Sequence, residues 1–161
     1  MPQDQFADLF RNLGLASVMV AATVLMHFWG LIVLLRLLNH TGHRLRAHES
    51  SAGQAMLLVL VVFGIFALHT AEIWLYAALY LGLGTLGALE PALYFSTVTF
   101  VSLGYGDLTL PPAWRLLGAI EAANGVILIA WSAGFLHTVT TRLRALEHNW
   151  LKPRPDDRPE S

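Results

Sequence analysis

Three long apolar runs, at residues 13–35, 55–83 and 114–139, limit what this chain can fold into. A helix needs roughly 20 mainly apolar residues to cross the hydrocarbon core of a membrane, and each run reaches that length. Inside a bilayer the backbone polar groups must be satisfied within the protein, and a helix satisfies them. We therefore predict an all-α membrane protein with three transmembrane helices.

The composition of the 161-residue chain supports this class and excludes several others. Hydrophobic residues make up 55% of the chain and charged residues 13%, which is too apolar for an ordinary soluble domain. Ten basic and eleven acidic residues give a net charge of -1, so the chain has no broad basic field for nucleic acid. It contains no cysteine, which excludes disulfides and thiolate metal sites. We find neither a nucleophile–base set nor a phosphate-binding loop, so we do not expect an enzyme.

Most basic residues follow the first and third apolar runs. They are Arg36, Arg44, Arg46, Arg142, Arg144, Lys152, Arg154 and Arg158. Only Arg11 and Arg115 belong to the other side. Because Lys and Arg of short loops are retained in the cytoplasm, we expect the N-terminus outside and the C-terminus inside a cell (inner) membrane. The start of the chain lacks a basic region, so we expect a retained first span rather than a cleavable signal peptide.

A shorter segment, Pro91–Val101, lies between the second and third runs. A helix of about eleven residues rises only about 16 Å, so it must enter the bilayer and turn back. Pro91 suits the first turn of such a helix because it has no N–H to leave unpaired. The C-terminus of this helix then points into the membrane, where the negative end of its dipole favours a cation.

Two glycines at alternate positions, Gly104 and Gly106, follow this re-entrant segment. Glycine adopts positive φ without steric cost, and alternating such conformations lets successive carbonyls point the same way. Irregular backbone at membrane depth requires either burial in protein or an aqueous path. A row of carbonyls meets this condition if the path holds cations that exchange water for carbonyl oxygen.

The motif "SLGYGD", residues 102–107, closely resembles the selectivity-filter signature of potassium channels. The resemblance covers about residues 55–139 and is to small bacterial potassium channels with one pore loop per chain, here with an extra N-terminal span. It implies an outer helix, a pore helix, a filter and an inner helix, assembled as a homotetramer because one chain supplies a quarter of each ring. The K+ ligands that it implies are the Ser102 hydroxyl and the backbone oxygens of Ser102, Leu103, Gly104 and Tyr105. The alternative is that GYGD forms a tight turn outside the membrane.

The apolar runs and the resemblance together predict five regions. Residues 1–12 form an external N-terminus, and residues 13–38 form a peripheral transmembrane helix. Residues 39–54 form a cytoplasmic loop, and residues 55–141 form the pore domain. Residues 142–161 form a cytoplasmic tail, whose charged and proline-rich end we expect to be disordered.

Two positions depart from the family pattern. Ser102 replaces the usual threonine and lacks the methyl group that restricts its rotamer, so we expect a looser innermost ion site. Val98 stands where some relatives have a glutamate that braces the filter aspartate. Asp107, which with Gly106 supports the filter, therefore needs another partner, and Tyr94 is the candidate. Tyr94 can equally be an aromatic residue of the membrane interface.

Two glycines lie in the predicted inner helix. Gly125 falls about where the family has a hinge glycine. Glycine lowers the cost of bending a helix, but small residues also allow membrane helices to pack closely, and both interpretations apply to Gly125. For Gly134 we favour packing.

Two acidic residues lie within the predicted spans. Glu72 follows His69 by three positions and Glu121 precedes Asn124 by three, which puts each pair on nearly one helix face. Acids at such depth are costly unless they are paired, protonated or facing water. We favour a hydrogen-bonded brace between the outer, pore and inner helices, and the alternative is proton sensing or direct involvement in the ion path. The candidate partners of Glu72 are His69, Thr97, Thr99 and Asn124.

These features predict a potassium-selective channel that conducts K+ passively through a tetrameric filter. The expected partners are identical chains and the lipid bilayer, without nucleic acid. We expect K+ as the permeant ion and no organic cofactor. A weakly selective cation channel is one alternative, motivated by Ser102, and a non-conducting scaffold or auxiliary subunit is another.

Overall fold

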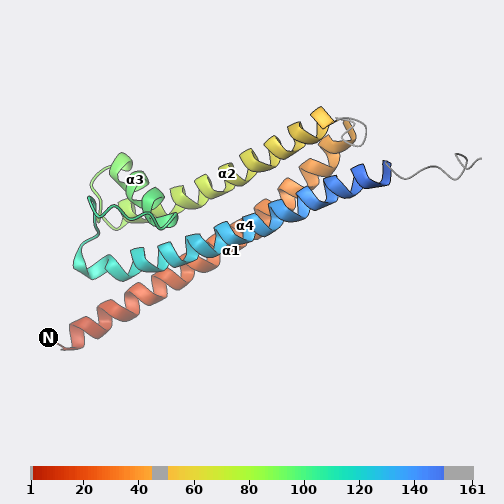
Figure 1. The fold of residues 1–161 in the computed structure, drawn as a ribbon. Helices are drawn as coiled ribbons and strands as arrows, with labels where there is room; N and C mark the ends of the chain where they lie inside the picture. The colour runs from red at the N-terminus through yellow and green to blue at the C-terminus, as the bar shows by residue number, and fades with distance from the viewer. Residues whose placement is uncertain (1, 45–50, 151–161) are drawn as a thin grey trace, which may run out of the picture.

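A computed structural model describes residues 2–44 and 51–150 of the chain. Every regular element in these residues is a helix (Figure 1). The elements are α1 (Pro2–Arg44), α2 (Ser51–Gly82), α3 (Leu89–Phe100), the short 3-10 helix η1 (Pro112–Trp114) and α4 (Arg115–Trp150). The predicted all-α class is confirmed.

Three segments are long and apolar enough to cross a membrane, as the sequence predicts. They are Phe6–His40, Ala52–Gly82 and Pro112–Leu143. Large apolar side chains such as Phe63 and Phe66 are exposed on α2 in the single chain. An exposed apolar surface of this kind suits contact with lipid or with another protein surface.

The helices extend beyond the predicted spans. α1 contains 43 residues and is therefore about 65 Å long, roughly twice the thickness of a hydrocarbon core. It includes nearly all of the predicted external segment 1–12 and the start of the predicted loop 39–54, because no proline after Pro2 interrupts this part of the chain. Likewise, α4 continues into the predicted tail, of which residues 151–161 lie outside the described residues.

The three long helices cross the bundle in alternating directions. α1 and α2 form an antiparallel pair, and α4 runs back alongside α1 (Figure 1). α3 lies next to α2 and α4, at the end of the bundle where α1 begins (Figure 1). The short helix is therefore confined to one end of the molecule.

Two buried apolar clusters hold the bundle together, one toward each end. The cluster near α3 draws on all four helices and includes Met19, Tyr80, Phe95 and Leu117. The cluster at the other end joins α1, α2 and α4 through Leu34, Leu38, Leu57, Val61 and Leu143. Because Phe95 belongs to the first cluster, α3 is packed into the bundle.

Small residues let α1 and α2 approach closely. A Cβ added at Gly30 would overlap the Leu68 side chain of α2, and one added at Gly64 would overlap the Leu34 side chain of α1. Lipid tails are as apolar as leucine, so membrane helices associate through close packing of this kind rather than through the hydrophobic effect.

We predict that Gly30→Val destabilises the folded protein more than Gly14→Val does. Both substitutions put the same side chain into α1, but no atom of the described residues lies within 4 Å of a Cβ added at Gly14. Overpacking at Gly30 should cost about 1–3 kcal/mol. Thermal unfolding in detergent measures the difference, and equal midpoints for the two variants would contradict close packing at Gly30.

Candidate functional site

The re-entrant helix α3 ends in the interior of the bundle. The centroid of the Phe100 ring, at its C-terminus, lies 5.6 Å from the centroid of the His69 ring of α2. The Phe100 backbone lies against Gly125, about 15 Å along α4 from Arg115. The chain then returns to the end of the bundle where α4 begins (Figure 1). α3 therefore enters the apolar layer and the chain turns back, as the sequence predicts.

The first turn of α3 is suited to its position. The helix contains 12 residues and begins at Leu89, slightly before the predicted start at Pro91. Glu90 lies in the first turn, where the positive end of the helix dipole stabilises an acid. Pro91 also lies in this turn, where an N–H has no partner within the helix.

The loop after α3 has positive φ at every second residue. Ser102, Gly104 and Gly106 have φ values of 56°, 50° and 78°. The sequence predicts positive φ for the two glycines but not for Ser102. A residue other than glycine in this region costs on the order of 1–3 kcal/mol, so Ser102 is a strained position.

The N–H groups at the start of this loop bond back to α3. Leu103 and Gly104 both donate to the Val98 carbonyl, at 2.8 and 3.1 Å. In the described part of the chain, the carbonyl oxygens of residues 102–105 accept no hydrogen bond. These residues are exposed in the single chain. Their carbonyl oxygens are therefore available to a ligand.

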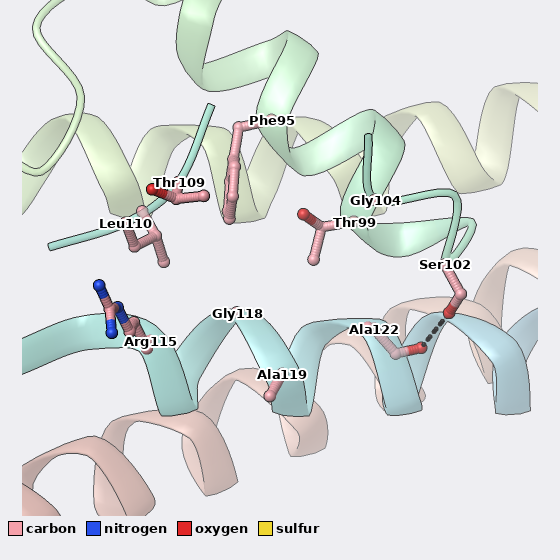
Figure 2. A pocket seen from close by; sticks show the side chains of 10 residues that line it. All are labelled: Phe95, Thr99, Ser102, Gly104, Thr109, Leu110, Arg115, Gly118, Ala119 and Ala122. Atoms are coloured by element: carbon pink, nitrogen blue, oxygen red, sulfur yellow. Dashed lines mark hydrogen bonds between the residues drawn. The ribbon is translucent and has the colours of Figure 1, made fainter. Parts of the chain in front are cut away.

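A cavity of about 420 Å³ lies between the loop, α3 and α4 (Figure 2). Phe95 and Thr99 line it from α3, and Arg115 lines it from α4. The Ser102 hydroxyl donates to the Ala122 carbonyl of α4 at 3.4 Å, which is a long and therefore weak hydrogen bond (Figure 2). A hydroxyl that donates its proton keeps lone pairs on its oxygen, so this contact is compatible with the predicted use of Ser102 as an ion ligand.

Tyr94 and Asp107 connect α3 to the far end of the loop. The Tyr94 hydroxyl donates to Asp107 Oδ2 at 2.7 Å, which is the pairing that the sequence predicts in the absence of a glutamate at Val98. This hydrogen bond raises the pKa of the Tyr94 phenol, which lies outside the three apolar segments. The contact holds the end of the loop against α3.

Glu121 joins the three helices of the predicted brace. The carboxylate is fully buried on α4. It accepts hydrogen bonds from the Tyr80 hydroxyl of α2 and the Ser96 hydroxyl of α3, each at 2.5 Å. The Ser96 hydroxyl also lies 3.0 Å from the Ile73 carbonyl oxygen. This network fixes α3 between the outer and inner helices.

Glu72 belongs to a different network, and the predicted partners on α3 are wrong. His69 Nδ1 lies 2.8 Å from Glu72 Oε2, as the spacing predicts. The other carboxylate oxygen, Oε1, lies 2.8 Å from Nδ1 of His27 on α1. Glu72 therefore faces α1 rather than α3, and Thr97 instead donates its hydroxyl to the Leu93 carbonyl of its own helix.

Asn124 is also not a partner of Glu72. Its amide group, on α4, donates to the Thr23 hydroxyl of α1 at 2.8 Å and to the Tyr76 hydroxyl of α2 at 3.2 Å. Three separate hydrogen-bond networks thus contain the four residues that the sequence predicts as a possible brace, which are His69, Glu72, Glu121 and Asn124. Each network crosses between helices.

The sequence-based prediction missed the partners that complete these networks. They are Thr23, His27, Tyr76, Tyr80, Ser96 and Ser132. His27 had a signal, because an ionisable residue inside an apolar span is costly and usually has a specific partner. The hydroxyl residues had none, because serine, threonine and tyrosine occur in membrane helices for many reasons.

Gly125 is a close-packing position. A Cβ added there would overlap the backbone carbonyl of Phe100, so the glycine lets α4 touch the end of α3. This favours the packing interpretation over the hinge interpretation in this conformation. No atom of the described residues lies within 4 Å of a Cβ added at Gly134, so the packing expected there is not found among these residues.

Comparison with known families identifies the fold. Residues 55–142 match a family described as ion channel. This stretch covers more than half of the chain and includes most of α2, all of α3, the loop and most of α4. The chain belongs to this ion channel family. No match was found among curated proteins or solved structures.

Family membership also gives the helices of this ion channel their setting. A channel works in a lipid bilayer, which agrees with the three long apolar helices. α1 lies outside the matched residues, because the match begins within α2. The match therefore includes most of the second and third apolar segments and none of the first.

We predict that Gly125→Ala displaces α3 in this ion channel. The added methyl group meets a backbone carbonyl, which cannot move aside as a flexible side chain can. The overpacking should cost about 1–3 kcal/mol, more than the roughly 0.5–1 kcal/mol that alanine gains over glycine in a helix. Gly134→Ala is the matched control. Thermal unfolding should show opposite shifts, and two stabilised variants would rule out the packing role.

We predict that Glu121→Ala destabilises the channel more than Glu121→Gln does. Alanine leaves the hydroxyls of Tyr80 and Ser96 without their acceptor, and such a loss typically costs about 1–3 kcal/mol. Glutamine keeps one acceptor oxygen and a similar shape. Unfolding midpoints measure both effects, and if the two substitutions behaved alike, hydrogen bonding would not be the contribution of Glu121.

Proposed function

We propose that this ion channel is selective for potassium and conducts K+ passively through a filter formed by residues 102–105. The loop itself carries the proposal. It has positive φ at alternate residues, and in the described part of the chain its carbonyl oxygens accept no hydrogen bond. Carbonyl oxygens are the ligands with which potassium filters replace the water around the ion.

The placement of α3 supports a cation as the permeant species. Its C-terminal end lies inside the bundle beside Gly125 and leads directly into the loop. That end carries the negative part of the helix dipole, which attracts cations by about 0.3–1 kcal/mol even at an exposed site. The attraction between the helix end and a cation is stronger where water is scarce, since the electrostatic interaction grows as the local dielectric constant falls.

A homotetramer is the assembly that this filter requires. One chain supplies one loop, so a closed ring of carbonyls needs four chains around a common axis. In the single chain, 53% of Leu103 and 68% of Tyr105 are exposed. The apolar side chains of Val126, Ile127 and Trp131 on α4 are exposed as well. Neighbouring copies and lipid would cover these surfaces.

We assign the residues around the ion ligands to the support of the filter. Gly106 continues the alternation of positive φ after the ligating positions. Asp107 and Tyr94 hold the end of the loop against α3 through their hydrogen bond. These residues would keep the carbonyls in place rather than bind the ion themselves.

We further propose that the filter faces the outside of the cell membrane. The start of α1 and the filter loop lie at the same end of the bundle (Figure 1). Arg36 lies toward the C-terminal end of α1 and Arg142 toward the C-terminal end of α4, so both are at the other end of the bundle from the filter loop (Figure 1). The retention of basic residues in the cytoplasm then places the C-terminus inside.

A weakly selective cation channel is the second candidate, and Ser102 favours it. Its hydroxyl is turned toward the Ala122 carbonyl, and its backbone is strained at a φ of 56°. Both features make the position of the Ser102 oxygens less fixed, so the innermost ion site would be looser. Reversal potentials of the purified protein in liposomes under K+ and Na+ gradients separate the candidates: a K+ potential supports a selective filter, and similar permeability to both ions supports the second candidate.

We predict that Gly104→Ala abolishes K+ flux while the tetramer remains assembled. An alanine at a φ of 50° costs about 1–2 kcal/mol in addition to the strain already present at Ser102, so the loop should leave the conformation that aligns its carbonyls. Flux into liposomes and the mass of the detergent complex measure the two effects.

Gly84→Ala is the matched control for this experiment. Gly84 has a φ of 64°, and a Cβ added there also has no atom within 4 Å, but it lies between α2 and α3 rather than in the filter. It should carry the same backbone strain and keep its flux. Normal K+ flux through the Gly104→Ala protein would refute the proposed filter.

A further inference from the structure

A buried cluster of two histidines and a glutamate lies between α1 and α2. His27 of α1 and Glu72 of α2 are fully buried, and His69 is 16% exposed. The three ligand atoms that these residues offer all lie within 4.8 Å of one another. The two imidazole rings are stacked, with their centroids 5.4 Å apart. The proposed conduction path uses none of these residues.

The charge of this cluster is not balanced by the side chains around it. In the described part of the chain, Glu72 is paired with His27 and His69 and with no Lys or Arg. If both imidazoles are neutral, one negative charge remains buried within a membrane span. Such a charge is costly unless a cation or a proton joins it.

We propose that His27, His69 and Glu72 bind a divalent transition metal of the Zn²⁺ class. Two imidazole nitrogens and one carboxylate are a ligand set that Zn²⁺ accepts, with a fourth position left to water. With metal–ligand bonds of about 2.0–2.1 Å, neighbouring ligands of a tetrahedral site are about 3.3 Å apart. The two nitrogen–oxygen distances are now 2.8 Å and involve different oxygens of Glu72, and all three ligand atoms lie within 4.8 Å of one another, so side-chain shifts would be needed to bring them to this spacing.

The hydrogen bond on the far side of His27 suits this role. Its Nε2 lies 3.3 Å from the Ser132 hydroxyl of α4. When Nδ1 binds a metal, the proton of the neutral ring moves to Nε2, which can then donate to the serine oxygen. A partner of this kind on the second ring nitrogen orients a ligating histidine and fixes its tautomer. Ser132 is therefore a positioning residue for the site.

A path to the cluster exists in the single chain. His69 and Ser132 line a cavity of about 670 Å³ between α2, α3 and α4. The cavity is lined mainly by apolar side chains, and the partly exposed edge of His69 is the point at which an ion would reach the cluster. The bound metal would tie α1 to α2 directly and to α4 through Ser132.

The test is a titration of the metal-free, full-length protein in detergent with Zn²⁺. We expect about one Zn²⁺ per chain by calorimetry and a rise in the unfolding midpoint. Co²⁺ should give the visible absorption of a low-coordinate nitrogen–oxygen site. His27→Asn and His69→Asn should weaken binding by at least about 100-fold, and Ser132→Ala by about 10-fold, as supporting partners do. Zn²⁺ affinity is independent of conduction, so this test stands apart from the potassium proposal.

Two sets of variants separate this site from surface binding. The exposed residues His40 and His137 are the matched controls, and their asparagine variants should bind Zn²⁺ as the unchanged protein does. Size-exclusion profiles identify any variant that fails to fold, and Ser132→Ala keeps the test informative because it leaves all three ligands in place. Stoichiometric binding that survives in His27→Asn and His69→Asn would overturn the proposal. So would a cluster that takes up protons as the pH falls but binds no Zn²⁺.

Discussion

The termination of α3 inside the apolar layer is the constraint on which the rest of this structure depends. A helix end leaves carbonyl groups without partners, and at membrane depth each of them needs one. The N–H groups of Leu103 and Gly104 satisfy Val98 at the end of α3. The carbonyls of residues 102–105 have no partner in the described chain, so the groups that still need a partner lie in the loop rather than at the helix end. The loop has the composition that this need requires, since Gly104 and Gly106 adopt positive φ at little cost.

Polar contacts rather than apolar burial determine where α3 sits. Lipid and leucine are equally apolar, so an apolar surface alone does not choose between neighbouring helices. The carboxylate of Glu121 makes that choice, because it accepts one hydrogen bond from α2 and one from α3. The contact between Gly125 and the Phe100 backbone then sets the depth of α3 along α4. The two interactions together position the loop that follows.

The sequence predicts those features that depend on one segment of chain. The number and approximate position of the spans, the re-entrant helix and the glycine conformations follow from local composition, and the structure has each of them, although its helices are longer than the predicted spans. Contacts between distant segments were harder to predict from the sequence. A spacing of three places His69 beside Glu72, but helical periodicity does not say which neighbouring helix the shared face meets. That face meets His27, 45 positions away, and the strain at Ser102 also depends on how the loop bonds back to α3.

α1 lies outside the residues that match the ion channel family, yet it shares two hydrogen bonds with α4. Asn124 bonds to Thr23 immediately before Gly125, and Ser132 lies 3.3 Å from His27 about two turns later. A bend of α4 at Gly125 would change the distance between these two anchoring points. It would therefore break at least one buried hydrogen bond unless α1 moved with α4, and an unpaired buried group costs about 1–3 kcal/mol. The first span thus braces the inner helix between Asn124 and Ser132, and a bend of that helix at Gly125 would either break one of these hydrogen bonds or involve α1.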